Sequence, residues 1–122
     1  MRFDVAFLPE RSVLSVRARG AGGPDSVQEM VTAIRATPAF QPGMRILIDG
    51  FGTTYAPSTQ EATALPGIFQ AQLPGSRLAA IVRAGGAQYT VACLVETIAS
   101  RRDVQFAVFP DRDEAMQWLT AP

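Results

Sequence analysis

In the middle of the chain stands the run Met44-Arg45-Ile46-Leu47-Ile48-Asp49-Gly50. Apart from Arg45 it is continuously apolar until Asp49-Gly50 ends it, which is typical of a central strand covered on both faces. Neighbouring parallel strands are joined by crossover connections that usually contain a helix. The run therefore predicts an α/β protein if helical segments lie on both sides of it.

Toward the N-terminus, two strands and one helix are expected. Residues 3–8 are mostly apolar, and residues 12–19 alternate between apolar and polar, so the two segments predict an antiparallel hairpin. Asp25 or Ser26 can cap the helix that follows. That helix should stop near Thr37-Pro38, because a residue before proline disfavours the α conformation.

After the central strand, Ser58 and Glu61 have the three-residue spacing of a capping box and predict the start of a second helix. Pro66-Gly67 interrupts this segment, so we expect a kink or two short helices there.

The rest of the chain continues to alternate. Residues 77–83 and 104–109 predict strands, residues 87–100 predict a helix, and Asp111 opens a last, short amphipathic helix. The expected order is β-β-α-β-α-β-α-β-α, which predicts a layered sheet of about five strands, mixed because of its N-terminal antiparallel hairpin. With no visible linker or repeat, residues 1–122 are expected to form one domain.

Composition removes several kinds of chemistry. The 122 residues contain no His, no Lys and one Cys, Cys93. Nucleophile systems that need an imidazole are therefore excluded, as are Schiff-base and P-loop lysines, and a zinc site is not expected. A disulfide within the chain would need a second Cys. The sequence thus predicts no metal and no cofactor, and activity as an enzyme is not favoured.

Charge and hydropathy limit which partners and which cellular location are expected. Eleven Lys+Arg balance eleven Asp+Glu, so the basic face that nucleic acids require is not expected. No stretch approaches the roughly 20 apolar residues of a membrane span. The start of the chain carries an acid at Asp4 and does not resemble a signal peptide. We therefore expect a cytoplasmic protein that binds no nucleic acid.

A candidate ligand or partner loop follows the central strand, because open α/β sheets bind ligands beyond the carboxyl ends of their strands. It comprises Asp49, Gly50, Phe51, Gly52, Thr53, Thr54 and Tyr55. Gly85 and Gly86 end the next strand at the same edge and could line the same cleft, as could Tyr89. The alternative is that the glycines only form turns and that the aromatic rings only cover the core.

The C-terminal run of residues 108–119 reads Val-Phe-Pro-Asp-Arg-Asp-Glu-Ala-Met-Gln-Trp-Leu. This ending and the element order resemble the STAS-domain superfamily, the SpoIIAA-like fold of anti-sigma-factor antagonists. In that family a phosphorylatable Ser lies in an Asp-Ser-Ser-Gly-like turn, and the matching place here is Ala56-Pro57-Ser58-Thr59-Gln60. The resemblance implies Ser58 or Thr59 as a phospho-acceptor, with Pro57 and Gln60 departing from the motif. The other interpretation of Ser58 is a helix cap alone.

The resemblance implies a non-enzymatic, regulatory binding module whose partner is another protein, a second copy of the chain or a small or lipid-like ligand. A homodimer is plausible because the apolar content is high and the net charge is zero. Candidate contact surfaces are the Phe51–Tyr55 loop and the helix carrying Ile68, Phe69 and Leu73. The alternative function is a small enzyme, or an anion- or nucleotide-binding protein, that uses the Asp49–Tyr55 loop.

Overall fold

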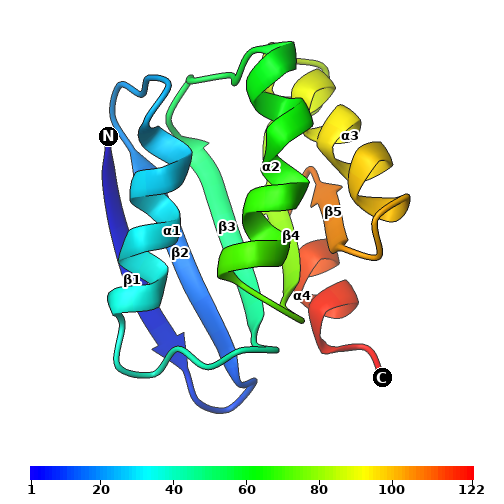
Figure 1. Cartoon of the computed structure of the whole chain (residues 1–122). Helices are drawn as coiled ribbons and strands as arrows, with labels where there is room; N and C mark the ends of the chain where they lie inside the picture. Colours follow the sequence, from blue (N-terminus) through cyan, green and yellow to red (C-terminus); the bar gives the residue numbers. More distant parts are fainter.

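The computed structural model describes residues 1–122 and has the expected order of elements (Figure 1). The strands are β1 (Arg2–Leu8), β2 (Val13–Arg19), β3 (Arg45–Gly52), β4 (Arg77–Ile81) and β5 (Gln105–Phe109). The helices are α1 (Ser26–Ala36), α2 (Thr59–Gln72), α3 (Ala87–Ser100) and α4 (Arg112–Thr120). The predicted α/β class is confirmed.

The five strands form one mixed sheet in the order β1-β2-β3-β4-β5. β1 pairs antiparallel with β2, and every later pair is parallel. Because the chain always steps to the next strand in the same direction, connections of the same hand place α1, α2 and α3 on one face of the sheet (Figure 1). Only α4, which follows the last strand, packs against the other face.

Two apolar cores result, one on each face. The larger core joins α1, α2 and α3 to the sheet, and its members include the fully buried Leu14, Val31, Ile34 and Ile46. The smaller core lies under α4 and joins Ala115 and Leu119 to strand residues such as Leu47. α4 contacts β3, β4 and β5, and the core beneath it also includes the buried Val13 at the start of β2.

The middle of the chain departs from the sequence predictions in two places. β3 continues to Gly52, so the first four residues of the expected loop belong to a strand. α2 is one continuous helix with Pro66 inside it, so the break into two short helices, one of the two alternatives expected there, does not occur. Pro66 is buried beside Leu65 and Phe69, so packing holds the segment in one helix despite the missing N–H.

At the starts of α2 and α4 the expected residue caps the helix with its side chain, whereas at the start of α1 Asp25 does not. Ser58 Oγ accepts a hydrogen bond from the Glu61 N–H at 3.1 Å, and Glu61 Oε1 accepts from the Ser58 N–H at 2.9 Å. This confirms the predicted capping box. Asp111 caps α4 by accepting from the Glu114 N–H at 2.9 Å. Asp25 occupies the cap position of α1, but its side chain makes no capping bond.

None of the helices combines the length and the apolar character that crossing a bilayer requires.

Candidate functional site

An apolar cavity of about 140 Å³ lies between the sheet and the three helices that cover it. It sits toward the end at which β3 and β4 finish. No Asp, Glu or Arg side chain lines it, and most of its walls are apolar. The sheet contributes Phe3, Ala18, Ile48, Gly50, Ala80 and Phe106, and the helices contribute Ser26, Val27, Met30, Leu65, Phe69, Gln88, Val91, Ala92 and Val95. Met1, Thr53, Tyr55, Pro57 and Val82 complete the lining.

The cavity exists because the strands change from large to small side chains along their length. Toward their beginnings, β2, β3 and β4 place Leu14, Ile46 and Leu78 on the helix-covered face, and all three are buried. Toward their ends, Ala18 and Gly50 lie on the same face, because strand side chains alternate with a period of two. Ala80 continues this pattern in β4. The helices remain at the distance that the large residues set, so the small ones leave space.

Hydrogen bonds at the mouth of the cavity hold the segment after β3 in place. Gln88 Nε2 in α3 donates to the carbonyl oxygens of Thr53 and Tyr55, at 2.9 and 3.0 Å. Thr53 is buried, and its Oγ1 accepts from the Tyr55 N–H at 3.1 Å. The segment after β3 is therefore tied to the start of α3.

A phenol–carboxylate pair holds the same segment to α2. The Tyr55 hydroxyl donates to Glu61 Oε2 at 2.6 Å, while the other Glu61 oxygen takes part in the capping box. Burial, the hydrogen bond and the charge of Glu61 raise the pKa of Tyr55 to about 12. The hydrogen bond from Tyr55, followed by those at Ser58, lowers the pKa of Glu61. Tyr55 therefore stays protonated and Glu61 stays ionised over a wide pH range.

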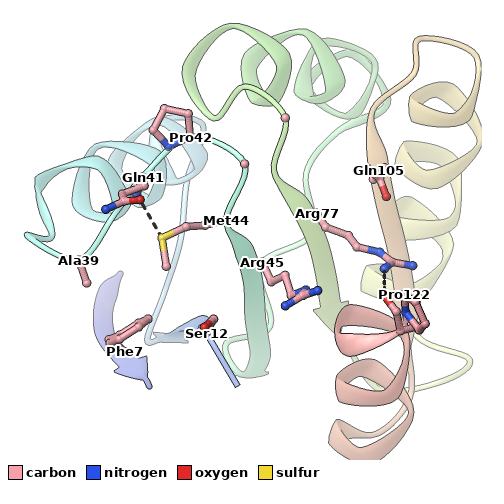
Figure 2. Close-up of a pocket in the computed structure, with 13 residues that line it drawn as sticks. Phe7, Ser12, Ala39, Gln41, Pro42, Met44, Arg45, Arg77, Gln105 and Pro122 are labelled. Atoms are coloured by element: carbon pink, nitrogen blue, oxygen red, sulfur yellow. Dashed lines mark hydrogen bonds between the residues drawn. The ribbon is translucent and has the colours of Figure 1, made fainter. Parts of the chain in front are cut away.

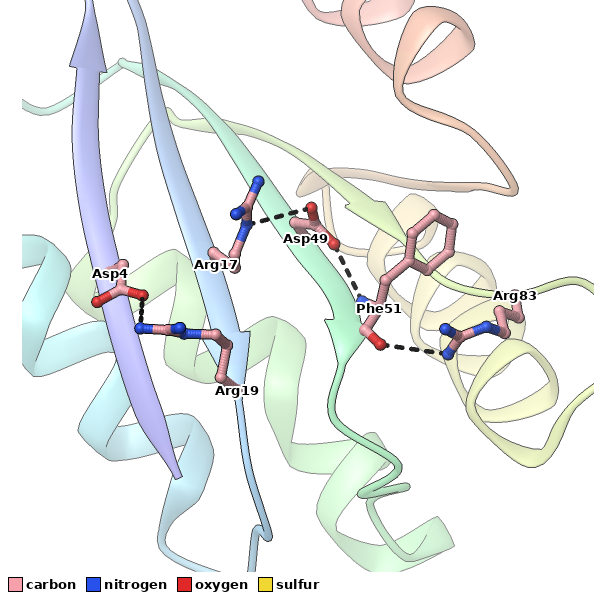
Figure 3. Close-up of polar contacts among 6 residues, drawn as sticks. All are labelled: Asp4, Arg17, Arg19, Asp49, Phe51 and Arg83. Atoms are coloured by element: carbon pink, nitrogen blue, oxygen red, sulfur yellow. Dashed lines mark hydrogen bonds and ion pairs between the residues drawn. The ribbon is translucent and has the colours of Figure 1, made fainter.

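The structure divides the expected Asp49–Tyr55 loop between the two faces of the sheet. Gly50, Thr53 and Tyr55 line the apolar cavity. Asp49 and Phe51 belong to the opposite face, where Asp49 Oδ2 lies 3.8 Å from Arg17 Nε, as Figure 3 shows. Asp49 Oδ1 also accepts from the Phe51 N–H at 3.0 Å.

Two further residues of that loop lie outside the cavity. Gly52 and Thr54 border a separate shallow surface beside Arg83. Arg83 Nη1 donates to the carbonyl oxygen of Phe51 at 3.2 Å, and its guanidinium lies 5.2 Å from the centre of the Phe51 ring (Figure 3). The loop therefore does not act as a single cradle.

The other candidate residues do not line the cavity. Gly85 and Gly86 are exposed, and Gly85 adopts a positive φ of 81°, as a turn residue does. Tyr89 is half-buried, and the neighbouring Cys93 is the main cause of its raised pKa. Ser58 and Thr59 are exposed at the start of α2. Of the proposed contact surface on α2, Phe69 and Leu73 are buried in the core, so that part of the prediction is wrong.

Sequence reasoning missed most of the lining. Gln88, next to the expected Tyr89, is the residue that ties the segment after β3 to α3 at the mouth. Ala18 and Ala80 were recognised only as strand residues. The available signal was the loss of side-chain volume at the end of each strand, which becomes meaningful only after the strands are aligned with one another.

No protein-family model matches the chain, and no curated protein matches it. The resemblance to the STAS superfamily therefore remains a prediction. Among the side chains that could bind metal, no group of three or more His, Cys, Asp or Glu is close enough to share an ion.

Proposed function

We propose that this protein is a non-enzymatic binding module whose ligand is a small, uncharged, apolar molecule held between the sheet and α1, α2 and α3. The observation that carries this proposal is the apolar cavity itself, in which 15 of the 20 lining residues are hydrophobic. A well-packed domain rarely leaves such a space, because each lost contact weakens the core.

The size of the cavity limits the ligand. Its volume of about 140 Å³ is close to that of an engineered apolar cavity of roughly 150 Å³ that binds benzene. Sites for drug-sized molecules are usually larger than about 300 Å³. The cavity as it stands suits one ring or a short branched chain. A lipid-like ligand would need α1 or α2 to move away from the sheet.

The polar groups at the mouth favour a ligand with at most one polar atom. Gln88 Nε2 already donates to two carbonyl oxygens, whereas its Oε1 accepts no hydrogen bond from the chain. A ligand hydroxyl could donate to that oxygen. A charged ligand would find no opposite side-chain charge in the lining and would lose its hydration without compensation.

An enzyme that uses the Asp49–Tyr55 loop is less well supported. That alternative required Asp49 and Tyr89 to face one cleft at the ends of the strands. Asp49 instead pairs with Arg17 on the other face of the sheet, and neither residue lines the cavity. The cavity thus contains no carboxylate for acid–base work.

The test is titration of the isotopically labelled protein with benzene, followed by nuclear magnetic resonance. Wild type should show saturable shifts at methyl groups that line the cavity, such as those of Ile48 and Val91. Ala80→Leu should fill part of the space and remove most of the binding, and Ala92→Leu is a second filling variant from the α3 wall. Absence of saturable shifts in the wild type would refute the proposal.

Ala6→Leu is the matched control. Ala6 is exposed on the other face of the sheet, in β1, so the same enlargement leaves the cavity open. Its benzene affinity should equal that of the wild type. If Ala80→Leu binds benzene as well as Ala6→Leu does, the probe sits elsewhere and the cavity is not the site.

A second candidate function, self-association, is favoured by the unequal edges of the sheet. At the β5 edge, Glu96 Oε2 accepts a hydrogen bond from the Val108 N–H at 2.8 Å. At the β1 edge, Arg2–Leu8 pairs only with β2, and Phe7 is 42% exposed. An open strand of this kind is a template for pairing with another strand.

We propose a second copy as the partner at that edge. Antiparallel pairing centred on Val5 would place Phe3 of each copy opposite Phe7 of the other, and aromatic pairs stabilise such contacts. Light scattering on a concentration series should show a dimer for the wild type and a monomer for Phe7→Lys. A wild type that stays monomeric at high concentration would contradict this candidate.

A further inference from the structure

A second cavity lies at the opposite end of the sheet, where β3 and β4 begin (Figure 2). Its volume is about 620 Å³. Residues from the segments that precede β3 and β4, from the strands and from the segment after α4 line it. Its lining comprises Phe7, Ser12, Ala39, Gln41, Pro42, Gly43, Met44, Arg45, Gly75, Arg77, Gln105, Ala121 and Pro122.

Two arginines are the charged side chains of this cavity. Arg45 and Arg77 are register partners in the parallel strands β3 and β4, so they occupy the same face of the sheet. Figure 2 shows both guanidiniums extending to that side. Like charges placed opposite each other on neighbouring strands destabilise a sheet. The repulsion between the two guanidiniums therefore has to be offset by an opposite charge or by other favourable contacts.

No acidic side chain of the protein pairs with either arginine. The ion pairs of the chain join Arg17 to Asp49 and Arg19 to Asp4, so neither cavity arginine has an acidic partner. No Asp or Glu lines the cavity. Both arginines are nevertheless half-buried, and two half-buried like charges without a counter-charge cost free energy.

The two arginines differ in how firmly they are held. Arg77 Nη1 donates to the carbonyl oxygen of Ala121 at 2.9 Å, and its guanidinium lies 4.3 Å from the centre of the Trp118 ring. The Nε of Arg77 is buried and has no hydrogen-bond partner. The Arg45 side chain makes no hydrogen bond to the chain. One guanidinium is thus positioned in advance, and the other is free to move onto a ligand.

We propose that the Arg45–Arg77 cavity binds a small oxyanion, a phosphate or a carboxylate. The planar guanidinium presents a fork of N–H donors that matches either group, and two forks on one face can hold a single anion between them. The Ser12 hydroxyl and the Gln105 amide line the same cavity and supply uncharged donors. An anion there would also remove the repulsion between the two arginines.

This site is independent of the proposed apolar site. The two cavities lie at opposite ends of the strands and share no lining residue. Failure of benzene binding would leave the anion site unaffected, and the reverse is also true.

The test is a calorimetric titration with inorganic phosphate and, separately, with succinate, combined with observation of the arginine Nε–H signals. Wild type should bind at least one of the two probes, with shifts of the Arg45 and Arg77 signals. Arg45→Gln should weaken that binding about tenfold or more, because charge-assisted hydrogen bonds are lost. Binding of phosphate alone assigns the site to phosphate groups, and binding of succinate alone assigns it to carboxylates.

Two further variants make the result specific. Arg101→Gln removes an exposed arginine just after α3, which does not line the cavity, and should bind like the wild type. Arg45→Lys keeps the charge, loses the fork and should lie between the wild type and Arg45→Gln. The proposal is overturned if neither probe binds, or if Arg45→Gln binds as well as Arg101→Gln does.

Discussion

On the helix-covered face, the two ends of the sheet are built from different side chains. Where the parallel strands begin, Leu14, Ile46 and Leu78 are almost completely buried and fill the space under the helices. Where the strands end, Ala18, Gly50 and Ala80 leave a cavity of about 140 Å³. The same strands and the same helices thus form a packed end and a cavity end.

The two ends are also stabilised by different interactions. Apolar burial holds the packed end. At the cavity end, where that burial is smaller, hydrogen bonds take over: the capping box of Ser58 and Glu61, the Tyr55–Glu61 pair and the contacts of Gln88. The comparison shows that one core can be tightly packed at one end of the sheet and leave an apolar space at the other.

The largest effect is expected at the packed end. Leu78→Ala should lower the free energy of unfolding by about 2–5 kcal/mol, because it removes buried methyl groups and leaves a void. Urea denaturation measures the loss. Without denaturant, folded Leu78→Ala should still bind benzene at the cavity end. A loss below that range would show that the packed end relaxes as easily as the cavity end does.

The neighbouring alanines of β4 provide the most direct comparison of the two environments. Ala79 is fully buried in the core under α4, whereas Ala80 lines the cavity on the other face. Ala79→Val should cost about 1–3 kcal/mol through overpacking. Ala80→Val adds the same atoms to empty space and should change stability by less than about 1 kcal/mol. Equal costs in urea denaturation would mean that the cavity end is as tightly packed as the rest.

Removal of the α2 cap should have a smaller effect. Ser58→Ala should lower the free energy of unfolding by about 1 kcal/mol, because the Glu61 N–H loses its acceptor. Thr59→Ala is the control, since the Thr59 side chain makes no capping bond. Thermal unfolding measures both variants. If they behave alike, hydrogen bonding at the start of α2 does not stabilise the cavity end.

A further effect on stability should appear only at high pH. Because the folded state raises the pKa of Tyr55 from 10.0 to about 12, its contribution to stability is complete below pH 10 and is lost as pH rises toward 12. In a Tyr89→Phe background, Tyr55 is the remaining tyrosine, and its ultraviolet titration should have a midpoint near 12. Adding Glu61→Gln should lower that midpoint but keep it above 10, because burial remains. A midpoint at 10 in the background variant would contradict the Tyr55–Glu61 contact.

Local patterns predicted the fold well. The alternation of residues 12–19 and the apolar run at residues 44–48 identified the second and central strands, and the Ser58–Glu61 spacing identified the start of α2. These features depend on neighbours a few residues apart, which a single sequence displays. The break into two helices that Pro66 allowed does not occur, because packing of Pro66 against the core overrides local propensity.

The candidate site was less predictable. Gly50, Thr53 and Tyr55 of the expected loop line the apolar cavity, but Asp49 and Phe51 belong to the opposite face. β3 continues to Gly52, so its side chains alternate where a loop was expected. Gln88 was missed because its bonding partners are carbonyl oxygens more than 30 positions away in the chain.

By itself, the sequence determined the order of strands and helices, the mixed sheet and the absence of imidazole and lysine chemistry, since these follow from composition and from short-range periodicity. The tertiary structure alone decided which side chains meet. Alignment of β2, β3 and β4 brought Ala18, Gly50 and Ala80 together into a cavity, and the same alignment set Arg45 beside Arg77. Contacts between strands depend on register, and register emerges only when the whole sheet packs against its helices.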